Sequence, residues 1–259
     1  MRITAFGATD PGRRRSNNED DLAIVDLTTE KNVAELEVRE LPVGKAGVFL
    51  AVCDGVGGRR AGEIASSLAL SELVQEIEAL DDGCPRGEVF RKAVERVNRT
   101  VWQKAKDDPS LEGMATTLTA AVVCRGRAVL AHVGDSRAYV LREGQIRQVT
   151  RDQSFVESLV VAGALTEEEA AHSPYRNVIL QAIGRKKAVE VALDAVDLRE
   201  GDVLLLCTDG LSEKLAPADI TRELAREDIP AAIRRMIELA NERGGEDNIT
   251  ALAARLSDV

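Results

Sequence analysis

Aromatic residues are scarce in this chain of 259 residues, of which they make up only 3%. Hydrophobic residues still reach 44%, so the core has to be built from valine, leucine, isoleucine and alanine. No apolar run approaches the roughly 18 residues that a membrane-spanning helix needs. The opening, MRITAFGATD, also lacks the basic start and the long apolar stretch of a signal peptide. We therefore expect a soluble, cytoplasmic globular protein that does not associate with membranes.

Histidine and closely paired cysteines, the usual zinc ligands, are also rare. The two histidines, His132 and His172, form no ligand pair, and the cysteines show no CxxC spacing. Both facts argue against a zinc site. The cysteines are Cys53, Cys84, Cys124 and Cys207. We expect them to be buried free thiols in a reducing compartment.

Positive charge is in deficit, because 34 lysines and arginines face 44 aspartates and glutamates, giving a net charge of -10. Nucleic acids and anionic membranes are bound by basic surfaces, so we expect this chain to bind neither. Most of the acidic side chains would simply be solvated and serve solubility.

Short runs rich in valine and leucine predict strands in the middle and at the end of the chain. These runs cover residues 47–53, 117–124, 128–133, 138–141, 203–207 and 249–256. Turn motifs at residues 125–127 and 142–145 predict hairpins between neighbouring strands. Helical spacing of apolar residues predicts helices over residues 64–80, 90–105 and 229–243, the first two as an antiparallel pair.

Strands joined by hairpins, with the helices grouped apart, predict an α+β fold of antiparallel sheets covered by helices. No GxGxxG follows a strand, which argues against a parallel dinucleotide-binding sheet. No linker or repeat divides the chain, so we expect one domain over residues 1–259. The polar segment 27–47 is interpreted as a surface hairpin or excursion.

Acidic residues stand at the ends of several predicted strands. A single Asp-Gly pair is most often a turn, but five acidic strand ends need another explanation. A carboxylate at the mouth of a buried strand loses hydration, at a cost of several kcal/mol unless a cation compensates. Aspartate oxygens suit hard ions such as Mg²⁺ and Mn²⁺. The acidic segments are Asn18-Glu19-Asp20-Asp21, Asp54-Gly55, Gly134-Asp135, Asp209-Gly210 and Glu246-Asp247-Asn248.

Arg15 lies five residues before Asp20. It is either part of a solvated basic turn or a guanidinium that holds a phosphate with two parallel hydrogen bonds. An arginine beside two carboxylate-bound ions fits the hydrolysis of phosphate monoesters. A water that bridges two such ions is a hydroxide at neutral pH, and the ions neutralise charge on the phosphoryl oxygens.

In order along the chain, these motifs resemble those of the metal-dependent protein phosphatases of the PPM (type 2C) family, in their bacterial form. The resemblance spans nearly the whole chain. The matching segments are Asp10-Pro11-Gly12 with Arg15 and Asn18-Glu19-Asp20, Asp54-Gly55-Val56-Gly57-Gly58, Met114-Ala115-Thr116-Thr117-Leu118, Gly134-Asp135-Ser136-Arg137, Thr208-Asp209-Gly210 and Gly245-Glu246-Asp247-Asn248.

The resemblance implies a four-layer αββα sandwich with a flap over about residues 150–177. It implies the hydrolysis of phosphoserine and phosphothreonine on proteins by a hydroxide that bridges two Mn²⁺ or Mg²⁺ ions. The enzyme would be a monomer and would reverse a serine/threonine protein kinase.

The resemblance also implies a role for each site residue. Asp20, Asp54 and the Gly55 carbonyl would bind the two core ions, with Asp54 bridging them. Asp209 and Asp247 would hold one of these ions, and Asp135 with Asp209 would hold a third ion beneath the flap. Arg15 would bind the substrate phosphate, so Arg15 and Asp54 are the catalytic candidates.

The chain departs from the family pattern at several positions. Arg59, Val56 and Gln153 stand where members carry histidine, and Ala115 stands where glycine is usual. The sequence therefore offers no general acid, and a metal-bound water would protonate the leaving alkoxide instead.

Two other functions have to be weighed. Cys53 and Arg59 have the spacing of a thiolate phosphatase loop, but the adjacent Asp54 would raise the thiol pKa. Alternatively, the chain is an inert domain that binds phosphoproteins or a kinase. Inert members lose metal carboxylates, whereas this chain keeps them.

Overall fold

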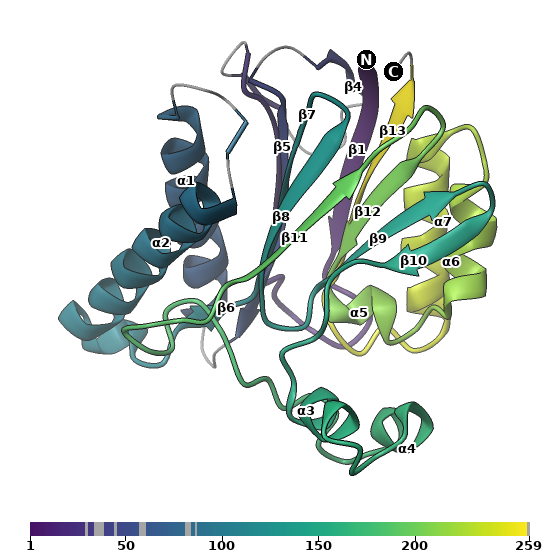
Figure 1. Ribbon diagram of the computed structural model, residues 1–259. Coiled ribbons are helices and arrows are strands. Elements are labelled where there is room, and N and C mark those ends of the chain that lie inside the picture. The colour runs from purple at the N-terminus through teal and green to yellow at the C-terminus, as the bar shows by residue number, and fades with distance from the viewer. Residues whose placement is uncertain are drawn as a thin grey trace.

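Two antiparallel sheets lie face to face in the centre of the molecule, and helices cover their outer faces (Figure 1). The computed structural model describes residues 1–28, 31–33, 39–43, 46–56, 61–80, 84–85 and 87–257. This four-layer αββα arrangement confirms the predicted fold class. No helix in the described ranges has the length and apolar character to cross a bilayer.

The first sheet has the strand order β10-β9-β12-β13-β1-β4. Its strands are β1 (Arg2–Asp10), β4 (Arg39–Pro42), β9 (Arg137–Arg142), β10 (Gln145–Gln148), β12 (Val203–Cys207) and β13 (Ile249–Ser257). The sequence analysis missed β1, which pairs with β13 over its whole length. Its residues RITAFGATD are mostly small or polar, so the run lacks the valine and leucine signal used to predict strands.

The second sheet has the order β11-β8-β7-β5-β2-β3, and β6 pairs with the end of β5. Its strands are β2 (Asp20–Asp26), β3 (Lys31–Val33), β5 (Val48–Val56), β6 (Ala115–Thr116), β7 (Leu118–Cys124), β8 (Arg127–Val133) and β11 (Ala192–Asp197). All six predicted strands are present in the two sheets. β5 continues past its predicted end because β2 and β6 still pair with it at Asp54 and Gly55.

Helices α1 (Ala61–Glu78) and α2 (Gly87–Asp107) cover the second sheet, and the short 3-10 helix η1 (Pro109–Leu111) follows α2. On the other side α5 (Asp209–Ser212), α6 (Pro217–Leu224) and α7 (Ile229–Glu242) cover the first sheet. One apolar core lies between the two sheets, and one lies under each helical layer. The three helices predicted from apolar spacing are confirmed as α1, α2 and α7.

The segment predicted as a flap projects from one end of the sandwich and carries helices α3 (Phe155–Val161) and α4 (Glu167–Ala171) (Figure 1). Gly163 has a φ of +70°, which favours glycine and ends the first helical segment. Thr166 and Glu169 form a capping box at the start of α4.

Segment 27–47 is only partly described, because residues 29–30, 34–38 and 44–45 lie outside the described ranges. In its described part, β3 pairs with β2 of the second sheet and β4 pairs with β1 of the first. The segment is therefore an excursion from one sheet to the other, and β3 and β4 do not pair with each other as a hairpin would.

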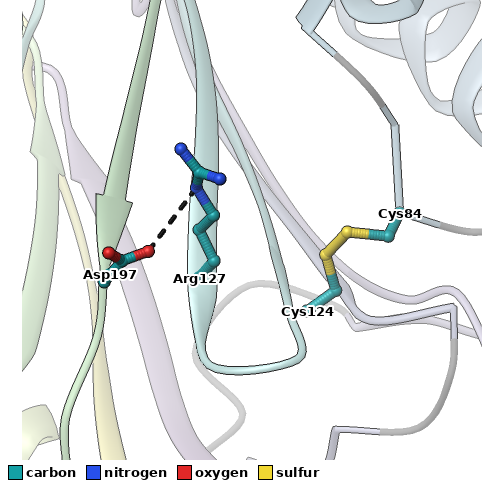
Figure 2. Close-up of a disulfide and its surroundings, with 4 residues drawn as sticks. All are labelled: Cys84, Cys124, Arg127 and Asp197. Atoms are coloured by element: carbon teal, nitrogen blue, oxygen red, sulfur yellow. Dashed lines mark ion pairs between the residues drawn. A yellow bond between two sulfur atoms is a disulfide. The ribbon is translucent and has the colours of Figure 1, made fainter.

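The prediction of four free thiols is wrong for one pair, because Cys84 and Cys124 form a disulfide (Figure 2). The bond joins the segment before α2 to the end of β7, beside the hairpin turn that leads to Arg127 and its ion pair with Asp197 on β11. The two cysteines are 40 residues apart, and only the packing of α1 and α2 on the sheet brings them together. Cys53 and Cys207 are free and buried, as predicted.

Candidate metal centre

Strand pairing places the first two candidate ligands opposite each other. Asp20 opens β2 and is the register partner of Asp54 near the end of β5. The Oδ2 atom of Asp20 accepts hydrogen bonds from the hydroxyls of Thr208, at 2.8 Å, and Thr250, at 2.7 Å. Thr250 lies on β13 and Thr208 directly follows β12, so Asp20 lies where the two sheets meet. Its Oδ1 atom is buried and has no hydrogen-bond partner.

The first sheet contributes two further aspartates at its strand ends. Asp209 opens α5 directly after β12, and Asp247 lies just before β13. The two segments come so close that a Cβ on Gly210 would lie 2.0 Å from the carbonyl oxygen of Asn248. Glycine is therefore required at this position. Like Asp20, Asp209 has a buried Oδ1 without a partner.

A cavity of about 470 Å³ opens at this edge of the two sheets. Six of the seven predicted site residues line it, and they are Arg15, Asp54, Gly55, Asp135, Asp209 and Asp247. Asp20 is not among the lining residues; it is buried and lies beside Asp54 on the neighbouring strand β2. The sequence therefore predicted which side chains converge, although the motifs lie up to 232 residues apart.

Burial raises the pKa of these aspartates above the ordinary value for carboxyl groups. The pKa is about 7 for Asp20, about 8 for Asp135 and about 6 for Asp209. Burial is the largest cause in each case, and repulsion from neighbouring carboxylates adds to it. Burial, and then the charge of Asp20, also raises the pKa of Asp54 well above its usual range. The negative charge of this cluster of buried aspartates is therefore not fully compensated by the protein's own cations.

A divalent cation fits this arrangement. It would supply the missing charge and use the buried, unpartnered oxygens of Asp20 and Asp209. Within the described residues, no three side chains of histidine, cysteine, aspartate or glutamate form a ready-made cage for one ion. Mg²⁺ and Mn²⁺ need no such cage, because Mg²⁺ in particular keeps several waters and takes one or two carboxylates.

Glu19 and Asn248 are site residues that the sequence analysis did not single out, and both line the cavity. The Asn248 side chain accepts a hydrogen bond from the Glu19 backbone N–H at 2.8 Å and donates to the carbonyl oxygens of Pro11 and Asn17. Asn248 thus fixes the loop before β2. Both residues lie inside the motifs quoted above, so their sequence position was the available signal.

Arg15 reaches the cavity from the same loop. One of its Nη atoms donates to Asp247 Oδ2 at 2.8 Å, and its side chain is 56% exposed. The hydrogen bond and charge of Asp247 raise the pKa of Arg15, so the guanidinium stays charged. Arg15 is therefore oriented towards the carboxylates and is accessible to an anion from solvent.

Asp135 lies in the turn between β8 and β9, on the side of the flap. Gln153, at the base of the flap, makes hydrogen bonds to both the backbone N–H and the backbone carbonyl of Gly134 in this turn. Its Oε1 accepts from the Gly134 N–H at 2.9 Å, and its own N–H donates to the Gly134 carbonyl at 2.7 Å. The residue that replaces a family histidine thus positions the Asp135 turn.

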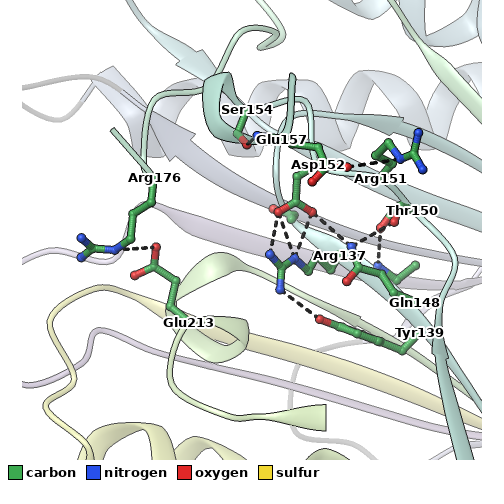
Figure 3. A network of polar contacts seen from close by, with 12 residues as sticks. Arg137, Tyr139, Gln148, Thr150, Arg151, Asp152, Ser154, Glu157, Arg176 and Glu213 are labelled. Atoms are coloured by element: carbon green, nitrogen blue, oxygen red, sulfur yellow. Dashed lines mark hydrogen bonds and ion pairs between the residues drawn. The ribbon is translucent and has the colours of Figure 1, made fainter. Parts of the chain in front are cut away.

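A second cavity, of about 620 Å³, lies between the flap and α5 and shares Asp135 and Asp209 with the first. Figure 3 shows that ion pairs surround it. The guanidinium of Arg137 holds the carboxylate of Asp152 with two of its nitrogens, and Arg176 on the flap faces Glu213 at 3.8 Å. The flap is thereby fastened to β9 and contacts the segment that carries Asp209.

The thiolate alternative disagrees with the structure. Cys53 is completely buried in β5, and burial raises its pKa well above the usual value for a thiol. The nearby charge of Asp21 raises it further. Such a thiol stays protonated and is not a nucleophile. Arg59, the other residue of that alternative and one of the departures from the family pattern, lies outside the described residues.

The chain is similar in sequence to named phosphatases. PstP of Mycobacterium tuberculosis, a serine/threonine protein phosphatase, is 41% identical over 213 residues, which cover 81% of this chain. The match spans only 40% of that protein's length. The serine/threonine phosphatase stp of Listeria innocua is 34% identical over 94% of this chain and 92% of its own length.

Solved structures and a family model agree with these relatives. The crystal structure of M. tuberculosis PstP/Ppp has a TM-score of 0.85 at 34% identity, and the match covers 100% of both chains. The PstP catalytic domain in complex with 2 manganese ions has a TM-score of 0.78 at 36% identity, covering 99% of this chain and 100% of that one. The family model Protein phosphatase 2C matches residues 39–257. The chain therefore belongs to the protein phosphatase 2C family.

Proposed function

We propose that this protein removes phosphate from phosphoserine and phosphothreonine on other proteins, using two Mn²⁺ or Mg²⁺ ions. The observation that carries the proposal is the convergence of Asp54, Asp209, Asp247 and Arg15 on one cavity, with Asp20 paired to Asp54 on the neighbouring strand. A cluster of uncompensated buried carboxylates beside an accessible arginine suits a metal-assisted reaction on an anionic substrate.

Each residue has a role in this proposal. Asp20, Asp54 and the Gly55 carbonyl would hold the two ions, with Asp54 shared between them, and Asp209 and Asp247 would complete the ligands of one ion. The bound ions supply the attacking hydroxide and neutralise charge on the phosphoryl oxygens. Arg15 binds the phosphate and orients it. Asp135, with Asp209, holds a third ion on the flap side.

The proposal extends to the setting of the reaction. We place the enzyme in the cytoplasm as a monomer that reverses a serine/threonine protein kinase. The surface of the flap suits a protein substrate, because it exposes several large apolar side chains next to the cavity. These are Phe155, Val161 and Tyr175, and two more, Val178 and Leu180, are exposed just after the flap.

Hydrolysis of a phosphothreonine peptide and of a small aryl phosphate in Mn²⁺ tests this function. We expect wild type to hydrolyse both and to leave a matched phosphotyrosine peptide nearly untouched. Val161→Glu should lower kcat/KM for the peptide severalfold and spare the aryl phosphate, because Val161 is 61% exposed on the flap. Val161→Thr is the matched neutral control.

Failure to release phosphate from the phosphothreonine peptide would reject the proposed activity. Equal losses on both substrates in Val161→Glu would show that the flap shapes the catalytic centre, and its role in substrate selection would have to be abandoned.

Arg15→Ala should raise KM about tenfold or more and lower kcat less, because a hydrogen bond to a charged group contributes about 1.5–3 kcal/mol. Arginine grips phosphate in both the ground state and the transition state, so the loss appears mainly in binding. Steady-state kinetics on the aryl phosphate measure the effect, with the neighbouring Arg14→Ala as control. An unchanged KM would assign Arg15 to a solvated turn that pairs with Asp247.

A further inference from the structure

Two hydroxyl groups meet in the buried region beneath the metal centre. Thr117 lies between β6 and β7, and Ser136 lies between β8 and β9. Their oxygens are 2.7 Å apart, and the residues are only 1% and 0% exposed. Neither residue lines either of the two cavities described above. The pair therefore touches no substrate, and any effect on the reaction has to pass through its neighbours.

Thr117 holds the backbone of Asp54 on both sides. Its Oγ1 accepts a hydrogen bond from the Asp54 N–H at 2.9 Å, and its own N–H donates to the Asp54 carbonyl at 2.8 Å. The hydroxyl of Thr116 donates to the same carbonyl at 2.9 Å. Since Oγ1 of Thr117 acts as acceptor for Asp54, its proton is available for Ser136.

Ser136 directly follows Asp135, and its position is fixed from several directions. Its carbonyl accepts a hydrogen bond from the Thr119 hydroxyl at 2.9 Å, and Thr119 Oγ1 in turn lies 2.9 Å from His132 Nδ1. Because the Thr119 hydroxyl donates its one proton to Ser136, its oxygen is left to accept from His132. Burial lowers the pKa of His132 to about 4, so the imidazole is neutral. The hydroxyl of Ser136 therefore has a fixed place from which to contact Thr117.

The turn that contains Gly134 and Asp135 also packs closely against the Thr117 side chain. A Cβ added to Gly134 would lie 2.7 Å from Cγ2 of Thr117, so the turn that carries Asp135 sits directly on the Thr117 side chain. Gly134 also has a φ of +110°, which favours glycine. A shift of the turn would press on Thr117 and, through it, on the backbone of Asp54.

We propose that Thr117 and Ser136 are positioning residues that couple Asp54, in the core metal site, to Asp135, on the flap side. The hydroxyl pair fixes the distance between these two carboxylates before any ion binds, and so raises metal affinity. Partners of metal ligands commonly have this effect, and their loss costs 10- to 100-fold in affinity or activity. The inference rests on the proposed metal centre.

Calorimetric titration of the metal-free protein with Mn²⁺, without substrate, tests the proposal. Thr117→Val keeps the shape of the side chain but removes the acceptor for the Asp54 N–H, so Mn²⁺ affinity should fall about tenfold or more. Thr117→Ser restores the hydroxyl and should bind within about threefold of wild type. The matched control is Asn98→Leu, which removes a buried side-chain oxygen that accepts the Gly184 N–H at 2.9 Å and lines neither cavity. Its stability should fall similarly while Mn²⁺ affinity stays unchanged.

Ser136→Ala leaves the Asp54–Thr117 bond in place and removes only the coupling, so its affinity should fall about three- to tenfold, less than for Thr117→Val. The double variant should lose no more than Thr117→Val alone, because Ser136 acts through Thr117. Should Thr117→Val not fold, Thr117→Ser and Ser136→Ala decide the question.

Wild-type affinity in Ser136→Ala, or in a folded Thr117→Val, would overturn the proposal. Because no substrate is present, this outcome is distinct from a failure of the proposed activity. A protein that binds Mn²⁺ as expected but hydrolyses no phosphopeptide would reject the activity and leave the positioning role standing.

Discussion

Asp54→Asn is expected to lower kcat by about a hundredfold or more, since it removes charge from the residue placed between the two ions. Asparagine has nearly the same shape, so the fold should be retained and the loss should come from the proposed metal centre. The position of Asp54 supports the proposed role, because it is the register partner of Asp20 and lines the cavity with Asp209 and Asp247. Asp209→Asn should show a loss of similar size.

The adjacent Cys53→Ser is the matched control for this experiment. Cys53 is buried in β5, and burial keeps its thiol protonated, so the serine variant should keep most of its turnover. Turnover of an aryl phosphate in Mn²⁺, with a thermal melt of each variant, measures both effects. Retention of more than about a tenth of wild-type activity in both aspartate variants would mean that the site is misplaced.

Chelation of divalent metal is expected to abolish turnover, and added Mn²⁺ or Mg²⁺ should restore it. Removal of the metal should also change how the free energy of unfolding depends on pH. The pKa values of Asp20, Asp135 and Asp209 are about 7, about 8 and about 6 in the folded protein, against 3.8 for an ordinary aspartate. Between about pH 4 and pH 8 the folded metal-free protein therefore binds more protons than the unfolded chain.

The sign of the effect follows from this proton difference. When the folded state binds more protons, the free energy of unfolding falls as the pH rises, so the metal-free protein should melt at a lower temperature near pH 8 than near pH 5. Mn²⁺ binds the deprotonated carboxylates, so its stabilising effect should grow over the same range. A Mn²⁺ concentration about 100 times Kd would add about 2.7 kcal/mol, or several degrees in Tm.

Thermal melts in EDTA and in Mn²⁺ across this pH range measure the prediction. Asp209→Asn serves as a comparison, because it removes one of the groups whose pKa is raised and should flatten the pH dependence in EDTA. A metal-free protein that gains stability as the pH rises would contradict the electrostatic description of the site. Turnover that survives exhaustive chelation would reject the metal-dependent mechanism.

Local patterns were sufficient to predict much of the fold. The run at residues 203–207 became β12 with the predicted bounds, and the turn at residues 125–127 joins β7 to β8 as expected. β1 was missed because small and polar residues gave it no apolar signal, although it pairs over its whole length with β13. The segment forms a strand because it pairs with β13, which lies at the other end of the sequence.

The sequence by itself determined the chemistry of this protein. The five aspartates and Arg15 stand in recognisable motifs, and their residue types already favour a hard cation and a phosphate. Only the tertiary structure decided which backbone and hydroxyl groups hold them in place. Asn248 fixing the loop before β2, Gln153 holding Gly134, and Thr117 joining Asp54 to Ser136 are all contacts between segments far apart in the chain. The Cys84–Cys124 disulfide belongs to the same group. Such contacts form when sheets and helices pack, and no local pattern encodes them because each partner alone is an ordinary polar or buried residue.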